Sequence, residues 1–267
     1  DTSCIAAYKL GEDAIDLSGN YNGTASNVTF NLPGHLTRNN KGTLESEVSA
    51  NQTNGFSIVK YTGDGGNATV GHGLAKKPEM MIVKSSSSTS QWMIYHKDLT
   101  GNTNGDNPYN LYFGIFAELD LTSFGSYHEL TSSVFPVTRQ SVNTAHTNNN
   151  DTDYIAYCWH SVPGFSKVGS YIGNFSATGP VVKTGFEPAF LMVQRATPAG
   201  NWFIFDNKRS PQNERDDFLH PNSNAVETTS SAAYSVDFLS DGFQIKGNGD
   251  QINGNSNKHV YIAFAHR

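Results

Sequence analysis

Two apolar runs, each followed by a short polar loop and a second apolar run, dominate the hydrophobic pattern of the chain. The first pair covers residues 78–84 and 92–95, and the second covers residues 188–195 and 202–205. Each run is short and has no helical period, and the first run of each pair begins with proline. This pattern is typical of strands that are buried on both faces at the centre of a sheet. We therefore predict two β-hairpins.

The two hairpins are copies of one pattern, because their first runs and their second runs both lie 110 residues apart. Tyr61 and Tyr171 lie at the same separation. A period of this length is too long for a solenoid and indicates a duplicated domain. We place an N-terminal segment and connector at 1–40, a first β-sandwich repeat at 41–162 and a second at 163–267. The junction between the repeats is very short, which predicts rigid docking.

Turn-forming residues interrupt the chain often enough to favour short strands over long helices. Gly occurs 25 times, aromatic residues make up 12% and charged residues only 16% of the chain. The predicted fold class is all-β, with two tandem antiparallel β-sandwich (jelly-roll-like) repeats related by internal duplication. We expect helical turns only around 115–119 and 214–219. Both lie in the segments that differ between the copies, 99–130 and 210–234.

The charge of the chain excludes some classes of partner. A net charge of −6 and a sequence pI of about 5.8 argue against nucleic-acid binding, which needs a basic face. No apolar run approaches the roughly 20 residues that span a bilayer, so we expect no membrane insertion. No signal-peptide pattern is present. The first residue, Asp1, suggests a processed or trimmed N-terminus.

The two cysteines, Cys4 and Cys158, are too few for a disulfide-stapled scaffold. In the alignment of the repeats, residues 154–158 match residues 261–265, so Cys158 falls where the second copy has Ala265. A position that holds alanine in one copy is small and buried. This favours a buried free thiol over a Cys4–Cys158 bridge.

Neither the histidines nor the acidic loops have the spacing of a metal site. The 9 histidines and 2 cysteines contain no zinc motif. His72 lies between two glycines at a predicted strand end, and its counterpart falls near Val182, which is not a ligand. Residues 62–67 and 247–250 are rich in Asp, Asn and Gly but lack the alternating carboxylates of a calcium loop. We interpret them as tight turns and predict no metal and no cofactor.

No catalytic motif stands out from the sequence. Glu118, Asp120 and Glu129 lie near one another, but nothing in their spacing identifies a carboxylate pair for glycoside hydrolysis. His96 aligns with Asp206, and these two could meet only across the interface between the repeats. We therefore predict no catalytic residues and no enzyme activity.

The aromatic residues divide into predicted core and predicted surface. Trp92 and Trp202 occupy matching positions in apolar runs, which favours the core over a sugar platform. Tyr109, Tyr112 and Trp159 have no aromatic counterpart and lie in or beside the variable segments. Binding residues concentrate on loops carried by a rigid scaffold. We therefore take these three as candidate glycan-binding residues.

Several strings in the chain also carry a resemblance to a known family. They are residues 48–53, 55–63, 69–74, 78–84, 154–158, 164–171, 185–190 and 202–209. Through them, residues 43–267 resemble an uncharacterised tandem-repeat β domain of marine bacteriophage tail and structural proteins. The opening of the chain, residues 7–24, resembles the start of a concanavalin A-like (laminin-G-type) lectin domain.

The resemblance implies a virion component and no reaction. On this basis we expect a structural surface protein of a bacteriophage virion, either a tail fibre or spike or a capsid decoration. It would form a homo-oligomer, with a trimer as our guess, and contact other virion proteins on the particle surface. The alternative function is a carbohydrate-binding module that recognises host-surface glycans.

Overall fold

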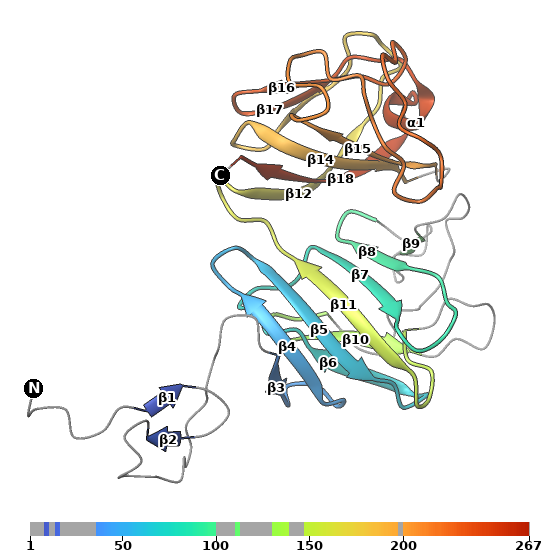
Figure 1. The fold of residues 1–267 in the computed structure, drawn as a ribbon. Coiled ribbons are helices and arrows are strands. Elements are labelled where there is room, and N and C mark those ends of the chain that lie inside the picture. Colours follow the sequence, from blue (N-terminus) through green and yellow to red (C-terminus); the bar gives the residue numbers. More distant parts are fainter. Residues whose placement is uncertain are drawn as a thin grey trace, which may run out of the picture. The chain divides into compact units, whose positions relative to one another are not determined.

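Antiparallel strand pairs make up nearly all of the regular structure in the computed structural model of the chain (Figure 1). The structure describes residues 8–10, 14–16, 36–99, 110–112, 130–138, 147–196 and 200–266. The chain divides into two compact units, Asp1–Thr37 and Arg38–Arg267. In the first unit, β1 (Tyr8–Leu10) and β2 (Ala14–Asp16) form an antiparallel pair. The prediction of an all-β fold is confirmed.

The first half of the larger unit is a sandwich of two sheets. One sheet has the strand order β3-β4-β5-β11-β7-β8-β9, and the other pairs β6 with β10. Side chains of both sheets form one core, in which Phe135 and Tyr154 are fully buried. The strands are β3 (Thr37–Asn39), β4 (Ser46–Asn51), β5 (Phe56–Thr62), β6 (Asn67–Gly71), β7 (Met80–Ser85), β8 (Met93–His96), β9 (Asn110–Tyr112), β10 (Val134–Thr138) and β11 (Asp153–Trp159).

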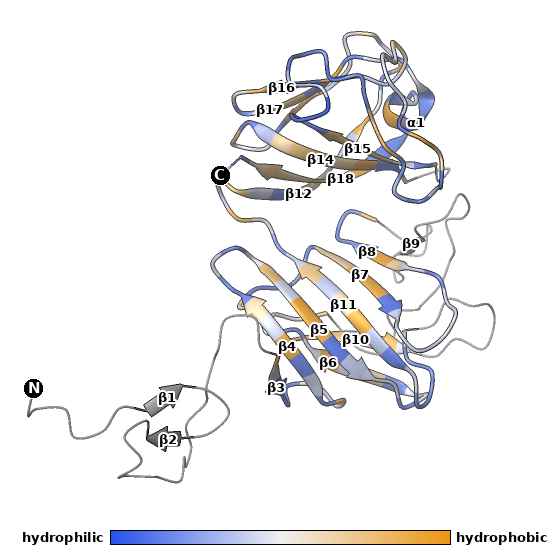
Figure 2. Cartoon of the chain, in the orientation of Figure 1, coloured by the Kyte–Doolittle hydropathy of each residue, from blue (hydrophilic) through white to orange (hydrophobic). Residues whose placement is uncertain are grey.

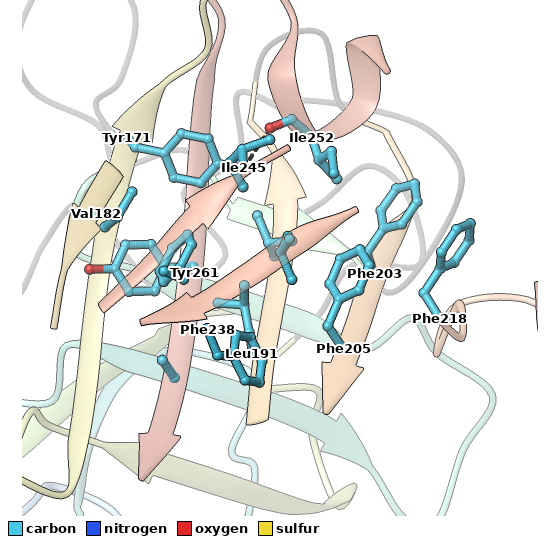
Figure 3. Packing of buried hydrophobic residues seen from close by; sticks show 14 of the residues in the cluster. Tyr171, Val182, Leu191, Phe203, Phe205, Phe218, Phe238, Ile245, Ile252 and Tyr261 are labelled. Atoms are coloured by element: carbon cyan, nitrogen blue, oxygen red, sulfur yellow. Dashed lines mark hydrogen bonds between the residues drawn. The ribbon is translucent and has the colours of Figure 1, made fainter. Parts of the chain in front are cut away.

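The second half is also a sandwich, with strand orders β12-β18-β14-β15 and β13-β17-β16. Its core is rich in aromatic side chains, including Phe203 and Phe205 (Figure 3). The strands are β12 (Ser166–Ile172), β13 (Val181–Lys183), β14 (Pro188–Arg195), β15 (Trp202–Asp206), β16 (Val236–Leu239), β17 (Gly242–Ile245) and β18 (Lys258–Ala265).

Both predicted hairpins are confirmed. β7 pairs with β8, and β14 pairs with β15, in each case antiparallel. β7 lies between β11 and β8, and β14 lies between β18 and β15, so the long apolar runs are central strands. Hydrophobic residues (orange) concentrate in the strands, whereas the connecting loops are mostly hydrophilic (blue) (Figure 2). Central strands need apolar side chains on both faces because each sheet is covered on both sides.

The face of each central sheet that points away from its own core packs against the other sandwich. A third apolar cluster joins side chains of β7 and β8, such as Met80 and Ile94, to side chains of β14, β15 and β18, such as Met192, Trp202 and Ile262. The seven-stranded sheet and the four-stranded sheet therefore pack face to face. The two sandwiches are thus docked through this shared core.

Polar contacts fix the junction that follows β11. The Ser161 hydroxyl donates to the Glu79 carboxylate and accepts the backbone N–H of Val168 at 2.9 Å. Lys97 forms an ion pair with the same carboxylate at 3.1 Å. Burial opposes ionisation of Glu79, but the bonds from Ser161 and Lys97 outweigh it and lower the pKa of this carboxyl.

Both sandwiches contain the same clamp, built from a tyrosine and a buried asparagine. The tyrosine hydroxyl donates to the backbone carbonyl that precedes the asparagine. The asparagine side chain accepts the backbone N–H of the residue three positions after the tyrosine. The residues are Tyr61, Asp64, Thr147 and Asn148 in the first sandwich and Tyr171, Asn174, Ile252 and Asn253 in the second. A duplicated domain is expected to keep such a clamp, and the duplication itself stays a prediction.

The strand pairing corrects the alignment of β11 in the first sandwich with β18 in the second. Cys158 pairs with Met81 of β7, whereas the residue at the matching place on β14, Leu191, pairs with Ala263. The counterpart of Cys158 is therefore Ala263, two positions before the Ala265 that the sequence pattern indicated. The sequence pattern pointed to Ala265 because a shift of two residues along a strand keeps the same side chains on the inward face.

The helical turn predicted at 214–219 is wrong. Arg215, Phe218 and Leu219 form isolated bridges with other segments, and no helical residue lies in this range. The helix of the described chain is α1 (Asp250–Asn253), which begins at the last residue of the tight turn predicted at 247–250. Its last residue is the clamping Asn253. The other predicted helical turn, at 115–119, lies outside the described residues.

The prediction of a buried free thiol at Cys158 is confirmed. Burial raises the pKa of this thiol to about 12. Only the thiolate reacts, so Cys158 should not react with a thiol-specific reagent in the folded protein. We expect a Cys4→Ser variant, in which Cys158 is the remaining cysteine, to be labelled only after unfolding in denaturant. Rapid labelling of this variant under native conditions would contradict the burial. Cys4 itself lies outside the described residues.

Candidate functional site

An aromatic groove opens between the two sandwiches of the larger unit, and its volume is about 780 Å³. The first sandwich contributes Ile82 from β7, Trp92 from the loop before β8, and Tyr157 and Trp159 from β11. The second sandwich contributes residues 221–224, which follow β15. Ligand sites often have this size and this mixture of apolar walls with a few polar groups.

The alternation of β11 explains why its aromatic residues line the groove. Tyr154 and Cys158 face the core of the first sandwich and are fully buried. Tyr157 and Trp159 lie on the opposite face and are half-buried. The Trp159 ring stacks on Phe56 of β5 with centroids 5.2 Å apart, and on Tyr157 with centroids 6.2 Å apart. Three aromatic rings thus form a rigid row on the outer face of the sheet.

The core prediction for the two matching tryptophans is right for Trp202 and wrong for Trp92. Trp202 is fully buried, whereas Trp92 keeps 37% of its surface exposed. Alternation places both on the outer faces of their sheets, because Met93 and Phe203 face the two cores. The first sandwich covers Trp202. Trp92 lies at the margin of the packed area and lines the groove.

The polar side of the groove is held in place by the start of β15. The Asn222 side chain accepts the Trp202 backbone N–H at 2.9 Å and donates to Asn201 at 2.9 Å. His220 Nδ1 donates to the Trp202 carbonyl at 2.7 Å. These bonds fix His220 and Asn222, which precede Ser223 and Asn224, and the latter two are exposed at the groove.

The structure places only part of the predicted glycan site. Trp159 lies in the groove. Tyr112 lies in β9, where its backbone pairs with Met93, next to Trp92. Tyr109 lies outside the described residues. The glycan-binding role of these three residues stays a prediction.

The sequence missed Trp92, Tyr157 and the turn at 221–224. The turn lies within the variable segment 210–234, so its failure to match the other repeat was a usable signal. The match of Trp92 to Trp202 concealed the exposure of Trp92. Aligning the two halves of the sequence does not show which of the two tryptophans is covered by the other sandwich.

His72 in the first sandwich and Thr184 in the second have the same structural role. The His72 Nδ1 atom accepts the Leu74 backbone N–H at 3.1 Å, and the Thr184 hydroxyl accepts the Phe186 N–H at 3.4 Å. Pairing of β6 with β10 and of β13 with β17 makes Thr184, and not Val182, the counterpart of His72. Burial lowers the pKa of His72 to about 4, so it is a neutral turn residue at the end of β6.

His96 and Asp206 each cap the turn after their own strand and do not bind one another. His96 Nδ1 accepts the Asp98 backbone N–H at 3.2 Å, and Asp206 accepts the Lys208 N–H at 2.8 Å. His96 Nε2 donates across the interface to the Tyr261 carbonyl at 3.3 Å. Burial lowers the pKa of His96 to about 4, which keeps this bridging ring neutral.

The acidic turns are held by protein contacts. Asp64 accepts the Gly66 N–H at 2.9 Å and the Asn148 amide at 2.7 Å, as expected for a tight turn. Across the described ranges, no group of three or more His, Cys, Asp or Glu residues is placed to hold a metal ion. Glu118, Asp120 and Glu129 lie outside those ranges.

The chain thus folds into two docked β-sandwiches with an aromatic, solvent-open groove between them. The chain belongs to the family described as "Domain of unknown function (DUF7483)", whose model matches residues 6–267. The match covers both sandwiches, so the pair is part of one family domain. No curated protein and no solved structure matches the chain. Among the described residues, no helix has the length and apolar character needed to cross a membrane.

Proposed function

We propose that the protein is a non-catalytic recognition module that binds carbohydrate in the aromatic groove. The observation that carries this proposal is the combination of a solvent-open groove with two tryptophans from the first sandwich and a polar turn from the second. The Trp159 ring stacks on Phe56 and on Tyr157, and Trp92 remains partly exposed. Exposed aromatic faces of this kind cover the apolar C–H faces of sugar rings.

The rigidity of the groove favours binding. The row of rings is fixed by stacking, and the polar turn is fixed by its bonds to the Trp202 backbone. A ligand therefore meets a surface that is already ordered, which reduces the conformational entropy lost on binding. Ser223 and Asn224 can exchange hydrogen bonds with hydroxyl groups of a sugar that lies on the tryptophans.

Replacing Trp159 with alanine should weaken carbohydrate binding at least tenfold, since a central aromatic anchor usually contributes about 2 kcal/mol or more. Trp92→Ala should also weaken binding. The measurement is a screen on an oligosaccharide array, followed by calorimetric titration with the strongest binder. Phe175→Ala is the matched control, because Phe175 is 53% exposed but does not line the groove. Unchanged affinity in both tryptophan variants would refute the proposal.

A second candidate function is that of a structural protein on the surface of a bacteriophage virion, as a tail fibre, spike or capsid decoration. The observation that favours it is a set of apolar side chains in the second sandwich that remain about half exposed: Ile172 at 53%, Phe175 at 53% and Val181 at 49%. Exposed apolar side chains suit contact with another chain. In this function the protein forms a homo-oligomer, with a trimer as the expected state, and contacts other virion proteins.

This candidate is tested by light scattering after size-exclusion chromatography and by antibody labelling of purified particles. We expect a trimer that the double substitution Ile172→Asp and Val181→Asp dissociates, and labelling at the particle surface. A monodisperse monomer with no affinity for capsid or tail proteins would count against the structural role. The two candidate functions are compatible, because host attachment is a task of virion surface proteins.

A further inference from the structure

The strand register fixes the direction and the length of the aromatic floor. Trp159 pairs with Met80 on β7, and Tyr157 pairs with Ile82. On the other side of β7, Val83 pairs with Met93, which places Trp92 level with Lys84. The floor therefore runs diagonally across three strands, from Trp159 on β11 through Ile82 to Trp92 beside β8.

This diagonal is longer than a single sugar ring. Four residues along β7 correspond to about 13 Å, and two strand spacings add about 10 Å at right angles. The backbones that carry the two tryptophans are thus roughly 16 Å apart. An aromatic platform lies at each end of this distance, and Tyr157 and Ile82 lie between them. A ligand that uses both platforms must contain several linked sugars.

The charge of the groove lining also limits which glycans can bind. None of the described lining residues is acidic or basic. Lys84 lies two residues after Ile82 and therefore on the same face of β7. Its ammonium donates to the Ser85 carbonyl at 2.6 Å and to Ser90 at 3.4 Å. The Glu79 carboxylate is bound by Ser161 and Lys97. The net charge of −6 also repels anionic polymers.

We infer that the groove binds a neutral, extended oligosaccharide and discriminates against acidic glycans, an inference that rests on the proposed carbohydrate-binding function. The two tryptophans act as separate platforms for sugars that are several units apart in the same chain. A single terminal sugar reaches only one platform. An acidic sugar loses the hydration of its carboxylate without gaining a cationic partner among the described lining residues.

The test is a titration of the full chain with two series of oligosaccharides. One series contains neutral oligomers of glucose, mannose, galactose and N-acetylglucosamine with one to six sugars. The other contains uronic-acid oligomers of the same lengths, and each series is measured at low and at high salt. We expect the affinity for a neutral oligomer to rise at least tenfold with length and then to level off. Salt should change it less than twofold.

The tryptophan variants give a readout that a general loss of stability would not produce. Trp92→Ala and Trp159→Ala should each remove the advantage of the longer oligomers, and their affinity should level off at a shorter length. Uronic-acid oligomers that bind as tightly as neutral ones, or single sugars that bind as tightly as six, would overturn the inference and leave the proposed function standing. If no oligomer of either series binds, the proposed function itself fails.

Discussion

Replacing Trp202 with alanine should lower the free energy of unfolding by about 3–5 kcal/mol, the usual cost of removing a fully buried tryptophan. The same change at Trp92 should cost less than about 1 kcal/mol, as is common for partly exposed positions. The two residues hold the same place in the two hairpins, 110 positions apart. Trp202 is enclosed by the first sandwich and is 0% exposed, whereas Trp92 is 37% exposed in the groove.

This difference is measured by urea denaturation of the wild type and of both variants. Each variant is the control for the other, because the local sequence pattern and the size of the deleted side chain are the same. We also expect Trp202→Ala to loosen the packing of the sandwiches, which limited proteolysis near residue 162 would report. Equal losses of stability in the two variants would show that the packed area between the sheets is not where we place it.

Lowering the pH from 7 to 5 should destabilise the fold by about 2 kcal/mol for each of three buried histidines. Burial lowers the pKa of His72, His96 and His259 to about 4. The unfolded chain takes up these protons below a pH of about 6.5, and the folded chain does so only near pH 4. The unfolded state thus binds more protons between these values, and stability falls as the pH decreases through this window.

The loss has a structural cause in each case. Nδ1 of His72 and of His96 accepts a backbone N–H, so a second ring proton would break the turn that the histidine caps. His259 stacks on Tyr171 with ring centroids 4.8 Å apart, in the place where the first sandwich stacks Tyr154 on Tyr61. Its charged form would be buried inside the second sandwich.

Two substitutions guided by the matching positions of the second sandwich test this account. His72→Thr copies Thr184, and His96→Asn keeps an acceptor for the Asp98 N–H, as Asp206 does for its own turn. Each variant should lose about 2 kcal/mol less than the wild type between pH 7 and pH 5. The measurement is urea denaturation at constant ionic strength, kept at pH 5 or above so that carboxylates stay ionised. A wild type with equal stability at both pH values would refute the assignment.

Much of the fold follows from the sequence because strand-forming patterns are local. The apolar runs that begin at Pro78 and Pro188 contain the central strands β7 and β14, and their partners β8 and β15 begin within one residue of the start of the second runs. The burial of Cys158 was also predictable, since Ala265, its counterpart in the sequence pattern, and Ala263, its counterpart in the strand pairing, are both small. Alternation along a strand decides which side chains share a face, and this requires no knowledge of the partner sheet.

The candidate site was only partly accessible from the sequence. Trp159 was found because the alignment read from the sequence left it without an aromatic match, although the strand pairing makes Phe264 its counterpart. Its neighbours in the groove, Trp92 and the turn at 221–224, are separated by about 130 positions and come from different sandwiches. No periodicity connects residues so far apart. The alignment of β11 with β18 was misplaced by two residues because a shift of two leaves the same side chains on the inward face.

The hydrophobic pattern was sufficient to predict an all-β fold and its two central hairpins. What covers the outer face of each sheet became known only from the packing of the two sandwiches. This packing buries Trp202 in the core between the sandwiches and leaves Trp92 in the groove, although both lie on outer faces at matching positions. The physical reason is that burial of an outer face depends on which part of the other sandwich packs against it. This contact joins distant segments, so it leaves no local pattern in either copy.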